Sequence, residues 1–296
     1  MRQAIRFIPN LFTLGNLYCG FMALVHIARE EMITAVVFVA VALVLDFLDG
    51  FVARALSAQS ELGVQLDSLA DLVTSGIVPG FILYQMIVIN EGYYFVGVGE
   101  WPLSVMINAS VAALIPLAAA YRLAKFNLLE NHASHFEGLP TPAMTMVVVG
   151  IPLVLEANYH LNFYSPLSNA FVEVLGTERR WDASDIWLVK GMFNTLTYQV
   201  LAVFLSLMMV SNIPMLSLKL KGWSWAANKW SYAILIWAVL CYLIFIIPYI
   251  SFGPIEYGTI DYLILPIFMA GYFLLSFIYA TFDASKSKPK ADEIQS

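Results

Sequence analysis

The sequence predicts an all-α fold, a polytopic transmembrane helical bundle of about eight spans. Hydrophobic residues make up 60% of the 296 residues and charged residues only 12%, whereas soluble globular proteins carry roughly 25% charged residues. The apolar residues also gather in runs of about twenty, the length that a helix needs to cross the ~30 Å hydrocarbon core of a bilayer. These two observations exclude a soluble globular enzyme and indicate a helical membrane protein.

The apolar runs are separated by short polar stretches, and each run is long enough for one helix. The third run is expected to begin as a half-exposed helix over residues 63–71 before it becomes fully apolar. The longest polar connection, residues 159–194, is expected to be a solvated loop. The predicted spans cover residues 12–28, 33–55, 63–90, 103–127, 140–158, 195–213, 231–250 and 260–282.

The distribution of Lys and Arg predicts how the chain is oriented in the membrane. Eight spans place both termini on one side, and with that side cytoplasmic eleven of the fifteen Lys and Arg residues lie inside and four outside. Loops rich in Lys and Arg stay in the cytoplasm. We therefore expect a multi-pass protein of the cell (plasma or inner) membrane with its N and C termini in the cytoplasm.

The stretch from Asp46 to Asp71, DFLDGFVARALSAQSELGVQLDSLAD, combines four aspartates and an arginine with apolar neighbours. Its polar and small residues recur at helical spacing, so that they form one face on each of two helices. These helices are joined by a turn of about eight residues (55–62), so the two acidic faces can meet. The first face holds Asp46, Asp49, Gly50, Ala53 and Arg54, and the second holds Gly63, Asp67 and Asp71.

Four carboxylates packed together at a membrane boundary repel one another, and ionisable groups in membrane spans are costly and usually functional. A divalent-metal site built from oxygen ligands resolves this repulsion. Two ions a few Å apart can hold both the attacking and the leaving oxygen of a phosphate displacement. Arg54 is then either a side chain that reaches for the membrane surface or a phosphate clamp. The small residues favour close helix packing, and they also leave room for a flat ligand.

The spacing Asp46-x2-Asp49-Gly50-x2-Ala53-Arg54-x8-Gly63-x3-Asp67-x3-Asp71 resembles, without departure, the signature of the CDP-alcohol phosphotransferase family. That resemblance implies an integral-membrane, homodimeric transferase with a six-helix core, which depends on Mg²⁺ or Mn²⁺. Such enzymes displace CMP from a CDP-linked group by an alcohol. Residues 1–213 would form this core. Residues 214–282 hold two additional spans outside it, and the short polar tail over 283–296 is expected to be disordered and cytoplasmic.

The resemblance also implies a role for each motif residue. The four aspartates would hold two metal ions, and Asp71 would in addition be the general base. Arg54 would contact the diphosphate of the CDP-linked substrate. The cytidine pocket would be lined by Gly50, Ala53 and Gly63.

Two further stretches bear on the substrates. In PNLFTLGN, Pro9 suits a helix start, and Asn10 or Thr13 either caps that helix or lies near the nucleotide. In RLAKFN, Arg122 and Lys125 share a helix face at the cytoplasmic end of the fourth span. They either flank the membrane as positive charges or bind an anion, such as a substrate carboxylate or a lipid phosphate.

Together with the turn GLPTPA at residues 138–143, these stretches resemble the membrane-spanning phosphatidylserine synthases within the family. Lys125 stands where Arg is common there, which keeps the charge but loses a bidentate donor. The resemblance implies direct attack of the L-serine hydroxyl on CDP-diacylglycerol, which gives phosphatidylserine and CMP. Arg122 or Lys125 would then bind the serine carboxylate.

Two alternatives remain open at this point. Other members of the family use glycerol 3-phosphate or inositol phosphate as acceptor, and those substrates favour pockets with several basic groups. A divalent-metal transporter could use the four aspartates as an ion path, but its acids would lie near the middle of the membrane on broken helices. No nucleic-acid partner is expected in either case.

Overall fold

The computed structural model describes residues 2–29, 31–129, 137–158, 190–216, 225–252 and 264–282. Within these residues the protein is built from helices, and no strand occurs apart from an isolated antiparallel bridge between Glu137 and Pro214. The all-α class is therefore confirmed. The main helices are α1 (Arg2–Ala28), α2 (Met32–Ala55), α3 (Glu61–Leu72), α4 (Val78–Asn90), α5 (Leu103–Ser110), α6 (Leu114–Leu129), α7 (Thr141–Pro152), α10 (Thr195–Val210), α11 (Trp225–Phe252) and α12 (Ile264–Phe282).

Short irregular turns join some of these helices end to end into longer rods. A π-helical turn, η1 (Val73–Ile77), connects α3 to α4, and a 3₁₀ turn, η3 (Val111–Ala113), connects α5 to α6. A second π-helical segment, η4 (Leu153–Asn158), extends α7. As expected, the α3–α4 rod starts half-exposed, since Ala70 is the one buried residue of α3, and becomes mostly buried along α4.

Among the described residues, five helical stretches are long and apolar enough to cross a membrane, and the protein is membrane-integral. They are Phe7–Ala28, Met32–Ala55, Glu61–Asn90, Leu103–Leu128 and Leu265–Phe282. Two shorter apolar helices, Thr141–Leu155 and Thr195–Val210, lie where the fifth and sixth spans were predicted. Most of the predicted loop 159–194 and the predicted tail 283–296 fall outside the described residues.

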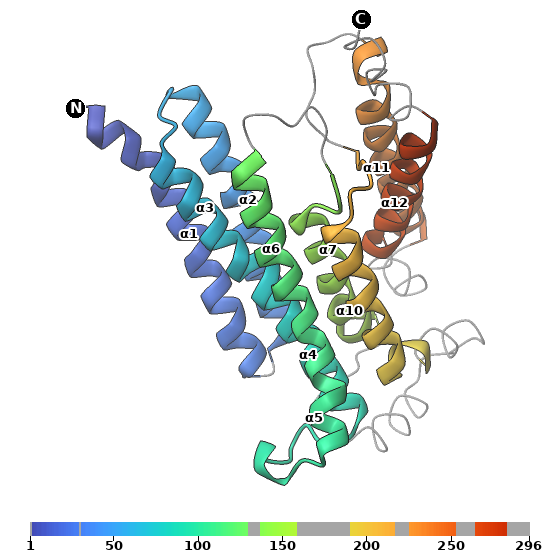
Figure 1. Cartoon of the computed structure of the whole chain (residues 1–296). Coiled ribbons are helices and arrows are strands. Elements are labelled where there is room, and N and C mark those ends of the chain that lie inside the picture. Colours follow the sequence, from blue (N-terminus) through green and yellow to red (C-terminus); the bar gives the residue numbers. More distant parts are fainter. Residues whose placement is uncertain are drawn as a thin grey trace, which may run out of the picture.

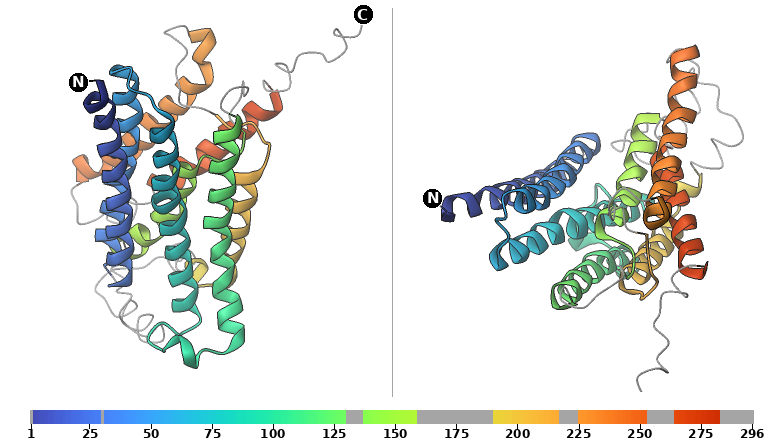
Figure 2. Two further views of the ribbon diagram at one scale, coloured as in Figure 1. Left: turned by 60° about the vertical axis from the view of Figure 1, so that its left-hand side comes forward. Right: turned by 90° about the horizontal axis from the view of Figure 1, so that it is seen from above.

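The helices form a bundle in which α4 lies near the centre, with its rod packed against α1, α7 and α10 (Figures 1 and 2). On one side of the bundle, α1 packs along both α2 and α3, while α6 packs on α3 and α10. The last two helices, α11 and α12, pack on each other, and α12 contacts α7 on the side away from α1 to α3 (Figure 1).

Two glycines permit close approach between these helices. A Cβ on Gly20 of α1 would lie 2.4 Å from the Thr74 methyl of η1, and one on Gly80 of α4 would lie 2.7 Å from Pro116 of α6. Because helices in lipid gain stability mainly from close van der Waals contact, small residues at such crossings favour association.

Two predicted boundaries were wrong. The first helix begins at Arg2 rather than near residue 12, so Pro9 lies inside it. Asn10 and Thr13 therefore cannot be N-caps, because the unpaired amides that a cap satisfies are those of the first helical turn. The turn between the acidic helices is also shorter than expected: it spans 56–60, and Ser60 caps α3 by accepting from the Gly63 amide.

Candidate metal centre

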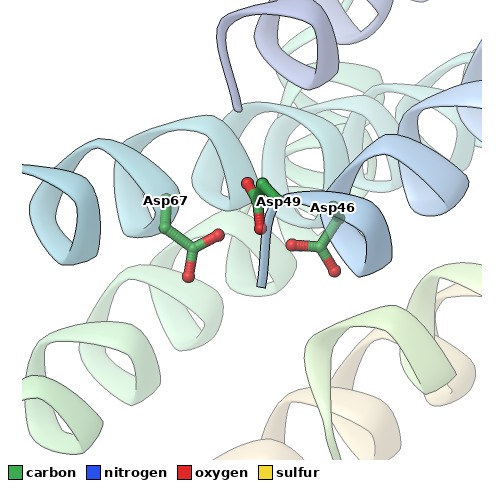
Figure 3. A group of neighbouring side chains, drawn as sticks. All are labelled: Asp46, Asp49 and Asp67. Carbon is green, nitrogen blue, oxygen red and sulfur yellow. The ribbon is translucent and has the colours of Figure 1, made fainter. Parts of the chain in front are cut away.

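Three carboxylates converge between α2 and α3. Asp46 and Asp49, three residues apart on α2, and Asp67 on α3 each offer an oxygen, and these oxygens lie within 4.8 Å of one another (Figure 3). Asp49 is buried, with 7% of its surface exposed, and the other two are half-buried. The two acidic faces therefore meet, as the helical spacing predicted.

Asp71 completes this group from the next turn of α3. Its carboxylate interacts with that of Asp46, and it lies within electrostatic range of the carboxylates of Asp67 and Asp49. The four aspartates of the motif therefore form one cluster, called here the carboxylate cluster. Residues three or four apart share a helix face, and α2 and α3 both pack against α1, which brings the two acidic faces together.

The carboxylate cluster has the chemistry of a divalent-cation site. Its donors are all hard, anionic oxygens, which is the ligand set that Mg²⁺, Mn²⁺ and Ca²⁺ prefer. A cation among them would offset the mutual repulsion of four like charges in partly buried surroundings. The residues present thus fit a divalent metal ion.

Helix α1 reaches into the same region. The Thr13 hydroxyl donates a hydrogen bond of 2.6 Å to Asp49 Oδ2, and Asn16 Nδ2 donates one of 3.3 Å to Asp71 Oδ1. Asn10 is also buried, and its Oδ1 would lie 3.3 Å from a Cβ added to Gly63. Asn10, Thr13 and Asn16 therefore face the acidic helices and do not cap α1.

The remaining motif residues lie around the carboxylate cluster. Gly50 is covered by the guanidinium of Arg54, whose Nη1 would lie 3.3 Å from a Cβ at Gly50. Arg54 is itself exposed, and its charge is felt by Asp49. Gly63 fits tightly, because an added Cβ would lie 3.1 Å from Ser60 Oγ. Ala53 is half-buried on the same helix face. These positions are compatible with a ligand beside the aspartates, and the roles expected for them stay predictions.

Arg122 and Lys125, at the end of α6, both have partners within the protein. Arg122 Nη1 donates to the backbone carbonyls of Glu137 (2.7 Å) and Met209 (3.0 Å). Lys125 Nζ donates to Asn212 Oδ1 at 2.9 Å and pairs with Glu137 at 3.4 Å. Arg122 thus ties α6 to the turn before α7 and to the end of α10. Binding of a substrate anion by either side chain stays a prediction.

Sequence reasoning missed two contributions near the carboxylate cluster. Asn16 was considered only as part of the PNLFTLGN run, although it lies three residues after Thr13 and shares its helix face. The second is a pair between Ser68 of α3 and Asn127 of α6, whose side chains hydrogen-bond at 2.9 Å. Because Ser68 follows Asp67 directly, this bond attaches the end of the RLAKFN run to the acidic helix.

Comparison with known proteins agrees with this geometry. The CDP-alcohol phosphatidyltransferase family matches residues 6–176, more than half of the chain and all of the carboxylate cluster. A CDP-diacylglycerol–serine O-phosphatidyltransferase of Helicobacter pylori (strain ATCC 700392 / 26695) is 31% identical over 213 residues, covering 71% of this chain and 84% of the relative.

Two further relatives carry related names. A CDP-diacylglycerol–serine O-phosphatidyltransferase of Bacillus subtilis (strain 168) is 32% identical over 145 residues, which cover 49% of this chain and 75% of the relative. An archaetidylserine synthase of Methanothermobacter thermautotrophicus is 28% identical over 169 residues, which cover 56% of this chain and 64% of the relative. None of these three is named a transporter. The chain therefore belongs to the CDP-alcohol phosphatidyltransferase family.

Proposed function

We propose that the protein transfers the phosphatidyl group of CDP-diacylglycerol to the hydroxyl of L-serine, giving phosphatidylserine and CMP. The observation that carries this proposal is the carboxylate cluster, assembled from the complete family motif of a membrane-integral chain. Serine as the acceptor is supported by relatives that are named for serine and that match at 28–32% identity.

The reaction is a single displacement at phosphorus. The serine oxygen forms a bond to the phosphorus that carries diacylglycerol, and the bond from that phosphorus to the oxygen of CMP breaks. Asp71 takes the proton from the serine hydroxyl as it attacks, and CMP leaves with the electron pair. The Asn16 amide donates to Asp71 Oδ1 and so orients the carboxylate that accepts this proton.

The other residues of the site bind and orient the substrates. Arg54 contacts the diphosphate, while Gly50, Ala53 and Gly63 line the cytidine pocket together with Asn10 and Thr13. Asp46, Asp49, Asp67 and Asp71 hold two divalent ions, Mg²⁺ or Mn²⁺. When bound, such ions neutralise charge on the phosphate oxygens and stabilise the leaving group.

The chain crosses the membrane eight times, with both termini and the carboxylate cluster at the cytoplasmic face. Its core comprises residues 1–213, and residues 214–282 add two spans. The packing of α11 and α12 beside α7, away from the acidic helices, supports this division. The protein works as a homodimer, in keeping with its family resemblance.

Arg122 or Lys125 binds the serine carboxylate, and Arg122→Ala tests the first of these two cations. The KM for serine is expected to rise about tenfold or more, because a hydrogen bond to a charged group contributes about 1.5–3 kcal/mol. The KM for CDP-diacylglycerol should change much less. Steady-state kinetics against each substrate separate the two effects.

Arg122→Lys serves as the matched variant, since it keeps the charge but cannot reach both carbonyls in the same way. If the KM for serine in Arg122→Ala stayed at the wild-type value, Arg122 would not be a serine-binding residue. That result would leave Arg122 with its structural contacts alone.

The acceptor itself is tested by an assay with labelled CDP-diacylglycerol in membranes that contain the expressed protein. L-Serine, glycerol 3-phosphate and inositol phosphate are offered separately, each with and without EDTA, and the lipid products are resolved. We expect phosphatidylserine as the main product, formed only without EDTA. If a phosphorylated lipid formed from glycerol 3-phosphate or inositol phosphate instead, that compound would be the acceptor in place of serine. If no acceptor gave a product, the transferase function itself would be contradicted.

A further inference from the structure

We propose that Thr13 and Asn16 of α1 are positioning residues, which hold Asp49 and Asp71 in the orientation that binds a divalent cation. This inference rests on the proposed function, because it takes the carboxylate cluster to be a metal centre. It adds a third helix to a site that the family motif places on α2 and α3 alone.

The two hydrogen bonds reach one carboxylate on each acidic helix. Thr13 donates to Asp49 of α2, and Asn16 donates to Asp71 of α3. Because the two donors lie three residues apart, they share one face of α1. Helix α1 packs along both acidic helices, and this face donates a hydrogen bond to each of them. One helix therefore sets the position of a carboxylate on each of its two neighbours.

The Thr13 hydroxyl has two acceptors within reach but only one proton. Its oxygen lies 2.6 Å from Asp49 Oδ2 and 3.3 Å from the backbone carbonyl of Pro9. The carboxylate is nearer and is the stronger, charged acceptor, so the proton is directed to Asp49. Thr13 is buried, with 3% of its surface exposed, and water does not compete readily for this bond.

Asn16 bonds to Asp71 at a cost. It is fully buried, and its amide oxygen has no hydrogen-bond partner among the described residues. A buried carbonyl without a partner is unfavourable, and an apolar side chain of similar size would avoid that penalty. An apolar side chain could not donate the hydrogen bond that the Asn16 amide donates to Asp71. The arrangement fits a side chain whose task is to direct the carboxylate.

These donors matter because the four carboxylates repel one another. Without donors, the side chains can rotate apart and increase the separation between their charges. The two hydrogen bonds each hold one oxygen, Asp49 Oδ2 and Asp71 Oδ1, and so limit the rotation of both carboxylates. Partners of this kind, which orient metal ligands without touching the metal, typically change metal affinity about 10- to 100-fold when they are removed.

The test is a direct titration with Mn²⁺, which needs no turnover. Purified full-length protein in detergent is stripped of metal with a chelator, and free Mn²⁺ is followed by electron paramagnetic resonance. Thr13→Val keeps the shape of the side chain without the donor, and Asn16→Leu removes the amide. Each is expected to raise the Kd for Mn²⁺ about 10- to 100-fold. Thr13→Ser, which retains the hydroxyl, should bind Mn²⁺ nearly as the wild type does.

Thr145→Val is the matched control, because Thr145 is also fully buried but its hydroxyl bonds only to the Thr141 carbonyl of its own helix, α7. Its Kd should stay at the wild-type value. If circular dichroism shows that Thr13→Val does not fold, Thr13→Ala is titrated in its place with the same expectation.

Folded variants of Thr13 and Asn16 that bind Mn²⁺ with the wild-type Kd would overturn the inference and leave the proposed function standing. The inference would fail equally if Thr145→Val weakened binding as much as Thr13→Val. A wild-type protein that binds no Mn²⁺ would instead contradict the metal centre itself, and with it both proposals.

Discussion

Asp71→Asn is expected to lower kcat by about 10²- to 10⁴-fold, the usual contribution of a general base. Asparagine has the same shape as aspartate but cannot accept the proton of the attacking hydroxyl. Its amide oxygen can still accept the hydrogen bond that Asn16 donates to Asp71 Oδ1 in the wild type. Helix packing and binding of CDP-diacylglycerol should therefore persist. Single-turnover rates and equilibrium binding of the lipid measure the two quantities separately.

Glu61→Gln provides the control for loss of one negative charge from the same helix. Glu61 lies in the first turn of α3 and is exposed, outside the carboxylate cluster. The turnover rate of the Glu61→Gln enzyme should match that of the wild type. An Asp71→Asn enzyme that turned over at nearly the wild-type rate would show that another group removes the proton.

Asp46→Asn is expected to have opposite effects on stability and activity. Asp46 interacts with Asp67 and Asp71 and lies within electrostatic range of Asp49. Removing the negative charge of Asp46 therefore relieves repulsion in the metal-free protein. Like charges at this separation repel by on the order of 1–4 kcal/mol per pair, depending on local solvation. After EDTA treatment the variant should therefore unfold at a higher temperature than the wild type. Its transferase activity should nevertheless be lost, because a metal ligand is missing.

Addition of Mg²⁺ or Mn²⁺ should reverse this order of stability. A ligand that binds only the folded state stabilises it by about 2.7 kcal/mol at one hundred times its Kd. The wild type should gain most of that stabilisation and the variant little of it. Thermal unfolding with and without metal measures both differences, and Glu61→Gln again serves as the charge control. A metal-free Asp46→Asn protein less stable than the metal-free wild type would argue against electrostatic repulsion in the carboxylate cluster.

The features that could be predicted from the sequence are those that depend on neighbours along the chain. Membrane-crossing helices follow from local hydrophobicity, and the acidic faces follow from the 3.6-residue helical period. Both held for the helices that carry Asp46, Asp49, Asp67 and Asp71. The start of α1 was missed because hydropathy detects membrane-length apolar runs, whereas the helix also includes residues 2–11, which precede the predicted span.

Contacts between segments that are distant in the chain could not be predicted from the sequence. Asn16 and Asp71 are 55 residues apart, and Arg122 is 87 residues from the carbonyl of Met209 that it binds. Nothing in the local pattern around Asn16 or Arg122 indicates these partners. A lone asparagine in an apolar helix and an arginine at a helix end are equally compatible with packing, flanking or binding roles.

Hydrophobicity and helical periodicity are local properties, and they were enough to predict a helical membrane protein with two aspartates on one face of each of two consecutive helices. The motif spacing then identified the family, which the comparisons confirmed. The folded structure was needed to see that α1 supplies hydrogen bonds to both acidic helices, and that Arg122 joins α6 to the ends of two other segments. Those outcomes depend on which helices lie side by side, and that arrangement is set by packing over the whole bundle.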